Sequence, residues 1–368
     1  MASASGVPQQ ICARAQALAD QVAARTGAAV DATQLLTGRA VQLGWAPRGP
    51  VSAGGATRLL GGADGWCALT LARSDDIDAV PALVGADRVD DPWQAVRGGV
   101  DDHGAAAVVE RARLLGLPAA LLGETAAAAP RIRTTGRART RPLADLLVAD
   151  LSSMWAGPLC GHLLANAGAT VVKVESPRRP DGTRAGPAAF YDWMNGGKLS
   201  YTVDFGDTEA LRRLLSVADV VIESSRPAAL NRRGFGPDAV EARDGRVWVQ
   251  ITGHGADAPG ADWVAFGDDA AVSGALVGYD GGRPVFVGDA MADPLTGLQA
   301  AEAVTASLGR GGGELIEVSM AATAARYAGL GGELQCATAP EPAVRAPASG
   351  ADNGRVHTMI EERWSVSC

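Results

Sequence analysis

The chain has 368 residues, a formal net charge of −8 and 47% hydrophobic residues. Such a chain is expected to bury a substantial core in two domains, or in one large domain with an appendage. Its acidic balance argues against a nucleic-acid-binding protein, which would present a broad basic face. The first residues lack the basic start and apolar run of a signal peptide, and no apolar run approaches the ~18 residues of a membrane span.

Five cysteines and four histidines are scattered along the chain. The cysteines are odd in number and never spaced as C-x-x-C, which favours free thiols in a reducing cytoplasm over a disulfide framework. No histidines stand at metal-ligand spacing, so no metal is expected. The cysteines are Cys12, Cys67, Cys160, Cys336 and Cys368.

The first third of the chain is predicted to contain two helices and a small α+β domain. Apolar residues recur at helical spacing over 8–25 and 31–43, so residues 1–46 are expected to form an N-terminal helical segment. The small domain follows over 47–125. Its predicted strands and helix are 65–72, 105–117 and a short strand after Pro118.

Residues 126–142 are expected to form a basic linker to the next domain. Five arginines lie within 131–141, and no apolar periodicity accompanies them. A segment of this kind is typically a solvated tether; a role in gripping phosphate is the alternative.

From residue 143 onward, strands alternate with helices, which predicts an α/β domain over 143–325 followed by a C-terminal tail over 326–368. Several of the strands are apolar throughout, as in a mostly parallel sheet that helices cover on both faces. The expected strands are 143–152, 170–175, 199–205, 219–224 and 246–253. The expected helices are 156–168, 209–218 and 294–309.

Ligands of such sheets bind beyond the carboxyl ends of the strands, so the loops there are the expected binding edge. These loops carry many cations, and arginine side chains suit phosphate oxygens. A local basic rim on an acidic protein fits a polyanionic ligand. The cations are Lys173, Arg178, Arg179, Arg184, Lys198, Arg226, Arg232 and Arg233.

The stretch "VGDAMADPLTGLQAA" at 287–301 contains two aspartates, Asp289 and Asp293. Pro294 disfavours helical geometry at Asp293 and is itself favoured at a first helical position, so Asp293 is predicted to cap the helix that follows. There it should stay ionised at neutral pH, which a carboxylate nucleophile requires. Asp289 is expected to be a loop residue outside any carboxylate pair.

Six sequence blocks between 143 and 325 occur in a recognisable order. They are "LLVADLSSMWAGPLCGHLLANAGATVVKVESP…DGTR", "NGGKLSYTVDF", "ADVVIESSRPAALNRRGFGP", "VWVQITGHGADAP", "AVSGAL" and "MADPLTGLQAAEAVTASL". This series resembles the class III CoA-transferase family of the CaiB/BaiF type, which includes formyl-CoA transferase, the carnitine CoA-transferases and α-methylacyl-CoA racemase. The resemblance implies a Rossmann-like large domain that binds coenzyme A at the strand ends.

The resemblance also implies roles for individual residues. Asp293 matches the family's catalytic aspartate. The positions implied to surround or bind coenzyme A are Met154, Trp155, Ala156, Glu175, Arg178, Val203, Asp204, Ser224, Ser225, Arg226 and Arg232. No tightly bound cofactor is expected, because coenzyme A and acyl-CoA are substrates.

Residues 47–125 resemble the family's small domain, but here that domain precedes the large one. The rearranged order leaves open whether the chain forms the family's interlocked homodimer or pairs with a related chain. The family's Gly-rich active-site lid has no clear counterpart; "SAGGATRLLGGADG" at 52–65 is the best match, with a structural turn as the alternative.

The implied reaction is transfer of CoA from an acyl-CoA donor to a carboxylic acid through a covalent aspartyl-CoA intermediate. The first alternative is a 2-methylacyl-CoA racemase, which needs two bases. The stretch before "SGAL" has no histidine to serve as the second; His254 lies earlier and is expected to be structural, and Asp268 and Asp269 would be poor replacements. The second alternative is a non-catalytic CoA-binding subunit of a family complex.

Overall fold

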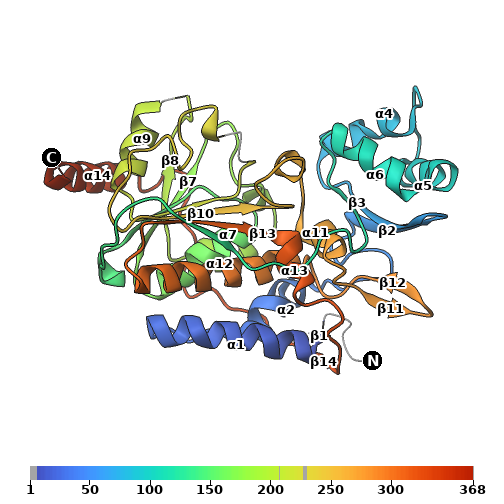
Figure 1. The fold of residues 1–368 in the computed structure, drawn as a ribbon, viewed down its shortest axis with the longest axis horizontal. Helices are drawn as coiled ribbons and strands as arrows, with labels where there is room; N and C mark the ends of the chain where they lie inside the picture. The colour runs from blue at the N-terminus through green and yellow to red at the C-terminus, as the bar shows by residue number, and fades with distance from the viewer. Residues whose placement is uncertain (1–5, 207, 227–229, 368) are drawn as a thin grey trace.

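A computed structural model describes residues 6–206, 208–226 and 230–367 (Figure 1). Its centre is a seven-stranded sheet in the order β5-β13-β10-β9-β6-β7-β8. Six strands run parallel, and β5 alone pairs antiparallel, with β13. The strands are β5 (Arg131–Thr134), β6 (Leu147–Asp150), β7 (Thr170–Glu175), β8 (Leu199–Thr202), β9 (Val220–Glu223), β10 (Val247–Thr252) and β13 (Glu314–Ser319).

Helices cover both faces of this sheet, because its inner strands are apolar on both sides. Val148 and Ile222 face a core shared with α7, α12 and, in an outer layer, α1. Leu147 and Val221 face a second core shared with α9 and α14. The helices are α1 (Gln9–Thr26), α7 (Ala156–Asn166), α9 (Thr208–Val217), α12 (Ala292–Gly309) and α14 (Asn353–Ser367).

A small α+β domain lies at one side of the large one (Figure 1). Its three-stranded antiparallel sheet has the order β2-β3-β4 and shares a core with α4, α5 and α6. The strands are β2 (Thr57–Gly62), β3 (Gly65–Thr70) and β4 (Ala119–Leu121). The helices are α3 (Ser74–Asp78), α4 (Val80–Val84), α5 (Pro92–His103) and α6 (Ala105–Leu114).

The small domain docks on α11 (Gly267–Ser273) of the large domain. Leu59 and Ala68 form a small apolar cluster with Val272. Beside it, the backbone N–H of Gly123 donates to the carbonyl of Val272 at 3.0 Å. These contacts bring the hairpin β2–β3 close to the N-terminus of α11.

The remaining elements are short or complete the layers. They are α2 (Ala32–Leu43), α8 (Ala188–Asn195), α13 (Met320–Ala325), the pair β1 (Val7–Pro8) and β14 (Leu334–Gln335), and the hairpin β11 (Gly278–Asp280) and β12 (Arg283–Val285).

The fold class is therefore the expected one, an α/β domain with a mostly parallel sheet plus a small α+β domain. Two local expectations differ. The linker 126–142 is not only a tether, since four of its residues form β5, whose edge position suits its exposed side chains. The stretch 52–65 contains β2 and the start of β3 as a hairpin. Cys368 lies outside the described residues, and the other four cysteines are free.

Candidate functional site

The site is built around the N-terminus of α12, where Asp293 is the second helical residue. The sequence-based expectation of an N-cap is wrong. The backbone N–H of Asp293 already donates to the carbonyl of Ala290 at 2.9 Å, so the helical turn begins before Pro294. The backbone N–H of Ala156, the first residue of α7, faces the Asp293 carboxylate and lowers its pKa. Two helix N-termini thus meet at one carboxylate.

Two glycines allow this approach. A Cβ on Gly297 would lie 2.6 Å from the carbonyl oxygen of Ala156, so only glycine lets α12 pack this closely on α7. A Cβ on Gly267 would lie 2.4 Å from Oδ2 of Asp293 and 2.4 Å from the carbonyl oxygen of Ala290. The first residue of α11 therefore lies directly against the Asp293 carboxylate.

Met154 and Trp155 form the turn between β6 and α7, and a buried ion pair fixes this turn. Met154 has φ of 73°, a left-handed conformation that costs a side-chain-bearing residue free energy. Its backbone N–H donates to Asp181 at 3.2 Å, and Asp181 pairs with Lys173 at 2.8 Å. Lys173 also donates to the carbonyl of Ser152. The ion pair holds both ends of the turn, and so aims the N–H of Ala156.

A second buried ion pair, Lys198 with Asp150 at 2.8 Å, lies at the end of β6. All four charged side chains are at most 2% exposed. Burial opposes ionisation of Asp150, but the ammonium groups of Lys198 and Lys173 outweigh it and hold its pKa below the usual range. We call the two pairs Asp150–Lys198 and Lys173–Asp181 the balanced cluster, since each carboxylate has its own cation.

Three carboxylates and one guanidinium form a contrasting group, the acidic cluster, made of Arg39, Asp268, Asp289 and Asp293. Arg39 on α2 donates through Nε and Nη2 to both oxygens of Asp289, at 2.7 and 2.6 Å. The guanidinium also lies 4.2 Å from the centre of the Trp155 ring. Asp289 is only 1% exposed. Asp289 is therefore a buried member of an ion pair. The sequence analysis placed it outside any carboxylate pair, whereas the structure groups it with other carboxylates.

Asp268 joins this cluster from the second residue of α11. Its Oδ1 accepts the backbone N–H of Ala290 at 3.0 Å, and its Oδ2 accepts the hydroxyl of Thr57 at 3.3 Å. The hydroxyl of Ser52 donates to it as well. Ser52 and Thr57 belong to the small domain, so that domain contacts the cluster directly.

The pKa values follow from burial and from this charge imbalance. Burial raises the pKa of Asp293 to about 7; Arg39 works against this rise, and Asp268 adds to it. Burial and the charge of Asp289 raise the pKa of Asp268 to about 6. Asp293 was expected to stay ionised at neutral pH because of its helix terminus. Burial overrides that effect, and Asp293 exchanges its proton near neutrality.

The residues implied to bind coenzyme A divide into exposed and buried sets. At the switch point between β6 and β9, the backbone N–H of Ser153 donates to the hydroxyl of Ser224 at 3.3 Å. The side chains open to solvent at this edge are Met154, Arg178, Ser224, Arg226 and Arg232, with Asp204 and Ser225 half-buried. The buried ones are Trp155, Ala156, Glu175 and Val203.

Several expected ligand groups are already engaged within the protein. Glu175 pairs with Arg184 at 2.5 Å, and Arg178 pairs with Asp204 at 3.2 Å. Ser225 donates to Glu223 at 3.0 Å. Of the eight cations expected to form a basic rim, three are therefore internal: Lys173, Arg184 and Lys198. These three stabilise the loops and are not open to a phosphate.

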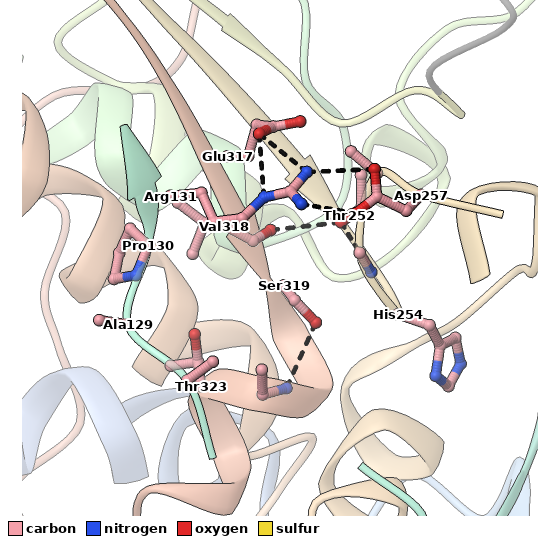
Figure 2. A pocket seen from close by; sticks show the side chains of 14 residues that line it. Ala129, Pro130, Arg131, Thr252, His254, Asp257, Glu317, Val318, Ser319 and Thr323 are labelled. Carbon is pink, nitrogen blue, oxygen red and sulfur yellow. Dashed lines mark hydrogen bonds and ion pairs between the residues drawn. The ribbon is translucent and has the colours of Figure 1, made fainter. Parts of the chain in front are cut away.

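A cavity of about 180 Å³ lies at the ends of β10 and β13 (Figure 2). Asp293 is not among the residues that line it. The Arg131 guanidinium spans its edge between Asp257, at 2.5 Å, and Glu317, at 3.0 Å. His254 lines this cavity, and its ring packs against Trp263 with centres 5.3 Å apart. Burial and Arg113 lower the pKa of His254 to about 4, so it stays neutral near pH 7.

Sequence reasoning missed Arg39, Asp268 and Gly267. Arg39 lies 250 residues from its partner Asp289, in a helix whose pattern explains it equally well as a surface cation. Asp268 was considered only as a replacement for a second base, and its place beside Asp293 was missed. The only sequence signal for it was its position shortly before the "AVSGAL" block.

Residues 143–357, more than half of the chain, match the sequence profile of CoA-transferase family III. The chain belongs to CoA-transferase family III.

Individual relatives resemble about half of the chain. The succinate–glutarate CoA-transferase of Agrobacterium fabrum is 34% identical over 46% of this chain and 48% of that protein. The succinyl-CoA–L-malate CoA-transferase beta subunit of Chloroflexus aurantiacus is 35% identical over 44% of each chain. A solved CAIB/BAIF family protein from Brucella suis is 30% identical over 51% of this chain and 55% of that chain, with a TM-score of 0.46. The chain thus spans about half the length of the curated relatives it matches.

Among the described residues, no helix is long and apolar enough to cross a membrane. Within the same residues, no group of three or more His, Cys, Asp or Glu side chains is arranged to hold a metal ion.

Proposed function

We propose that this chain transfers CoA from an acyl-CoA donor to a carboxylic acid, with Asp293 as the nucleophile. The observation that carries the proposal is the placement of the Asp293 carboxylate at the N-termini of α12 and α7, where the backbone N–H of Ala156 favours its ionised form. Membership of CoA-transferase family III and relatives named as succinate–glutarate and formyl-CoA:oxalate CoA-transferases support this chemistry.

The reaction has two covalent stages. The ionised Asp293 attacks the thioester carbonyl; the C–S bond breaks, which leaves a mixed anhydride and the CoA thiolate. The thiolate then attacks the aspartyl carbonyl, releasing the donor acid and forming an aspartyl-CoA thioester. The acceptor carboxylate attacks that thioester and its C–S bond breaks, which leaves a second mixed anhydride, between the acceptor and Asp293, and the CoA thiolate. The thiolate then attacks the acceptor carbonyl of this anhydride, which forms the new acyl-CoA and frees the Asp293 carboxylate. Each negative charge that forms lies near the positive ends of two helices.

Coenzyme A is proposed to lie along the carboxyl edge of the sheet, at the switch point between β6 and β9. Ser224, Ser225 and Arg226 line one side of this point, and Met154 lines the other. Arg178 and Arg232 are exposed cations for the phosphates, with Arg178 exchanging its partner Asp204. Trp155, Ala156, Glu175 and Val203 form the buried support beneath them, not direct ligands. Coenzyme A enters and leaves as substrate.

The alternative of a CoA-binding subunit keeps one supporting observation. A relative is named as a beta subunit, and the chain spans about half of its relatives. The purified chain should therefore be assayed alone and for self-association by light scattering. Transfer by the chain alone would exclude the subunit hypothesis, whereas CoA binding without transfer would favour it.

The nucleophile is tested by trapping. Acyl-CoA donor and hydroxylamine should modify Asp293, as read by peptide mass spectrometry, and Asp293→Asn should lose both modification and transfer. Asp91→Asn is the matched control, because Asp91 also precedes a proline at a helix start but caps α5 in the small domain. Retained transfer in Asp293→Asn, or labelling of another carboxylate, would overturn the assignment.

A further inference from the structure

The acidic cluster contains a feature that the transfer reaction alone does not require. One guanidinium serves three carboxylates, and Arg39 commits both Nε and Nη2 to Asp289. Asp268 and Asp293 therefore have no cation of their own among the described residues. They are also not separated by a bulky side chain, because Gly267, next to Asp268, lies against Oδ2 of Asp293.

The backbone links the two carboxylates through a single residue. Ala290 donates its N–H to Asp268 at 3.0 Å and accepts the N–H of Asp293 at 2.9 Å. The start of α11 and the start of α12 are thus locked together. Two carboxylates at such a junction cannot both ionise without mutual repulsion, and only one cation lies near them.

We propose that Asp268 is a positioning residue that shares one proton with Asp293, so that the ionisation of Asp268 sets the pH range in which Asp293 can attack. This inference rests on the proposed role of Asp293 as nucleophile. Asp293 attacks from the state in which Asp268 holds the proton, and no proton is consumed over the reaction.

Every charged group that faces Asp268 is consistent with this sharing. Asp289 opposes the ionisation of Asp268, and Arg39 from α2 favours it. The charge of Asp268 in turn raises the pKa values of Asp293 and of the adjacent Asp269. From the small domain come only hydroxyl donors, Ser52 and Thr57. The raised pKa values of Asp268 and Asp293, about 6 and about 7, fit a pair that titrates as a unit.

The small domain acts on this proton through those hydroxyl donors. A donor that bonds to the ionised Asp268 stabilises its charge and pushes the shared proton towards Asp293. Loss of such a donor should move the proton back. Docking of the small domain would then set the ionisation of the site as well as cover it.

The test is a titration of the free, full-length protein. Aspartate labelled with 13C at the carboxyl carbon reports each ionisation by NMR, and resonances are assigned with Asp293→Asn. In the wild type, the Asp293 signal should respond in two steps. Asp268→Asn keeps an oxygen acceptor for Ala290 but removes the charge, so Asp293 should titrate in one step about one unit lower. The acidic limb of the transfer rate should move by the same amount.

Two variants keep the test decisive. Asp269→Asn, the same change one residue further along α11, should keep the two-step response of Asp293, since the charge of Asp268 remains. Ser52→Ala, which removes a donor to Asp268 and spares every carboxylate, should raise the lower step. The titration of Ser52→Ala also tests the proposal if Asp268→Asn fails to fold.

The outcomes separate this inference from the proposed function. If Asp268→Asn folds and Asp293 still titrates as in the wild type, proton sharing is wrong even where Asp293 is the nucleophile. A purely structural Asp268 would lower kcat without moving either the titration or the pH profile. If Asp293→Asn retains transfer while the titrations remain coupled, the nucleophile assignment fails and the shared proton stands.

Discussion

The balanced cluster and the acidic cluster are both buried and lie at the two ends of the turn between β6 and α7. They differ in the number of cations per carboxylate. In the balanced cluster, two lysines meet two aspartates, and the pKa values of Asp150 and Asp181 fall. In the acidic cluster, one arginine meets three aspartates, and the pKa values of Asp268 and Asp293 rise. Matched charges fix the turn that carries Ala156, whereas the missing cation leaves Asp293 able to exchange a proton near pH 7.

Breaking the balanced cluster should have the largest effect on folding. Lys198→Met leaves Asp150 buried without its cation, which should cost about 3–5 kcal/mol of unfolding free energy, measured by urea denaturation. The double variant Lys198→Met with Asp150→Asn should recover most of that loss, since no charge is stranded. If the single variant is as stable as the wild type, the balanced cluster is not a structural device.

Asp269 extends the comparison to a carboxylate with no cation. It is fully buried, accepts from Thr70 at 2.9 Å, and its Oδ2 has no hydrogen-bond partner among the described residues. Burial raises its pKa to about 7. The folded state therefore holds a proton that the unfolded state releases near pH 4, so this group lowers stability as pH rises from about 4 to above 7.

The expected magnitude follows from the size of that shift. A rise of about three pH units corresponds to about 4 kcal/mol across the window. Asp269→Asn removes this contribution and keeps an acceptor for Thr70, so its unfolding free energy should fall less between acidic and mildly alkaline buffer than that of the wild type. Parallel curves for the two proteins would show that Asp269 ionises without penalty.

The sequence predicted the strands and helices of the large domain better than the residues of the candidate site. Apolar strands separated by helical patterns predicted β6, α7, β7 and β10, because burial on both faces leaves a local signal. The strand β5 was missed, since a short edge strand with exposed arginines carries no such signal. Asp293 was chosen through family resemblance, and its catalytic role stays a prediction.

The electrostatics of the site could not be predicted in the same way. A helix N-terminus favours an ionised Asp293, and nothing local indicates that Asp268 and Asp289 fold against it. Likewise, the sequence treated Lys173 and Lys198 as open cations, although each is buried with an aspartate. Whether a charge is matched depends on residues far away in the chain, and so only the fold decides it.

Arg39→Gln tests the acidic cluster through its one cation and should have the smallest effect on folding. The variant strands Asp289, but neighbouring carboxyl groups can take up a proton, a response that the balanced cluster lacks. We therefore expect a loss of about 1–3 kcal/mol, smallest in acidic buffer and growing as pH rises. Arg39 lowers the pKa of Asp293, so the acidic limb of the transfer rate should move to higher pH.

Arg25→Gln is the control for this substitution. Arg25 on α1 pairs with Glu302 of α12 at 2.8 Å, but its side chain is 36% exposed, so both stability and pH profile should stay close to the wild type. An Arg39→Gln loss that is large and independent of pH would mean that the acidic cluster stabilises the fold as the balanced cluster does. A loss of unfolding free energy that grows with pH instead means that a proton compensates for the removed Arg39 charge. Only protonation can neutralise a buried carboxylate once its cation is gone.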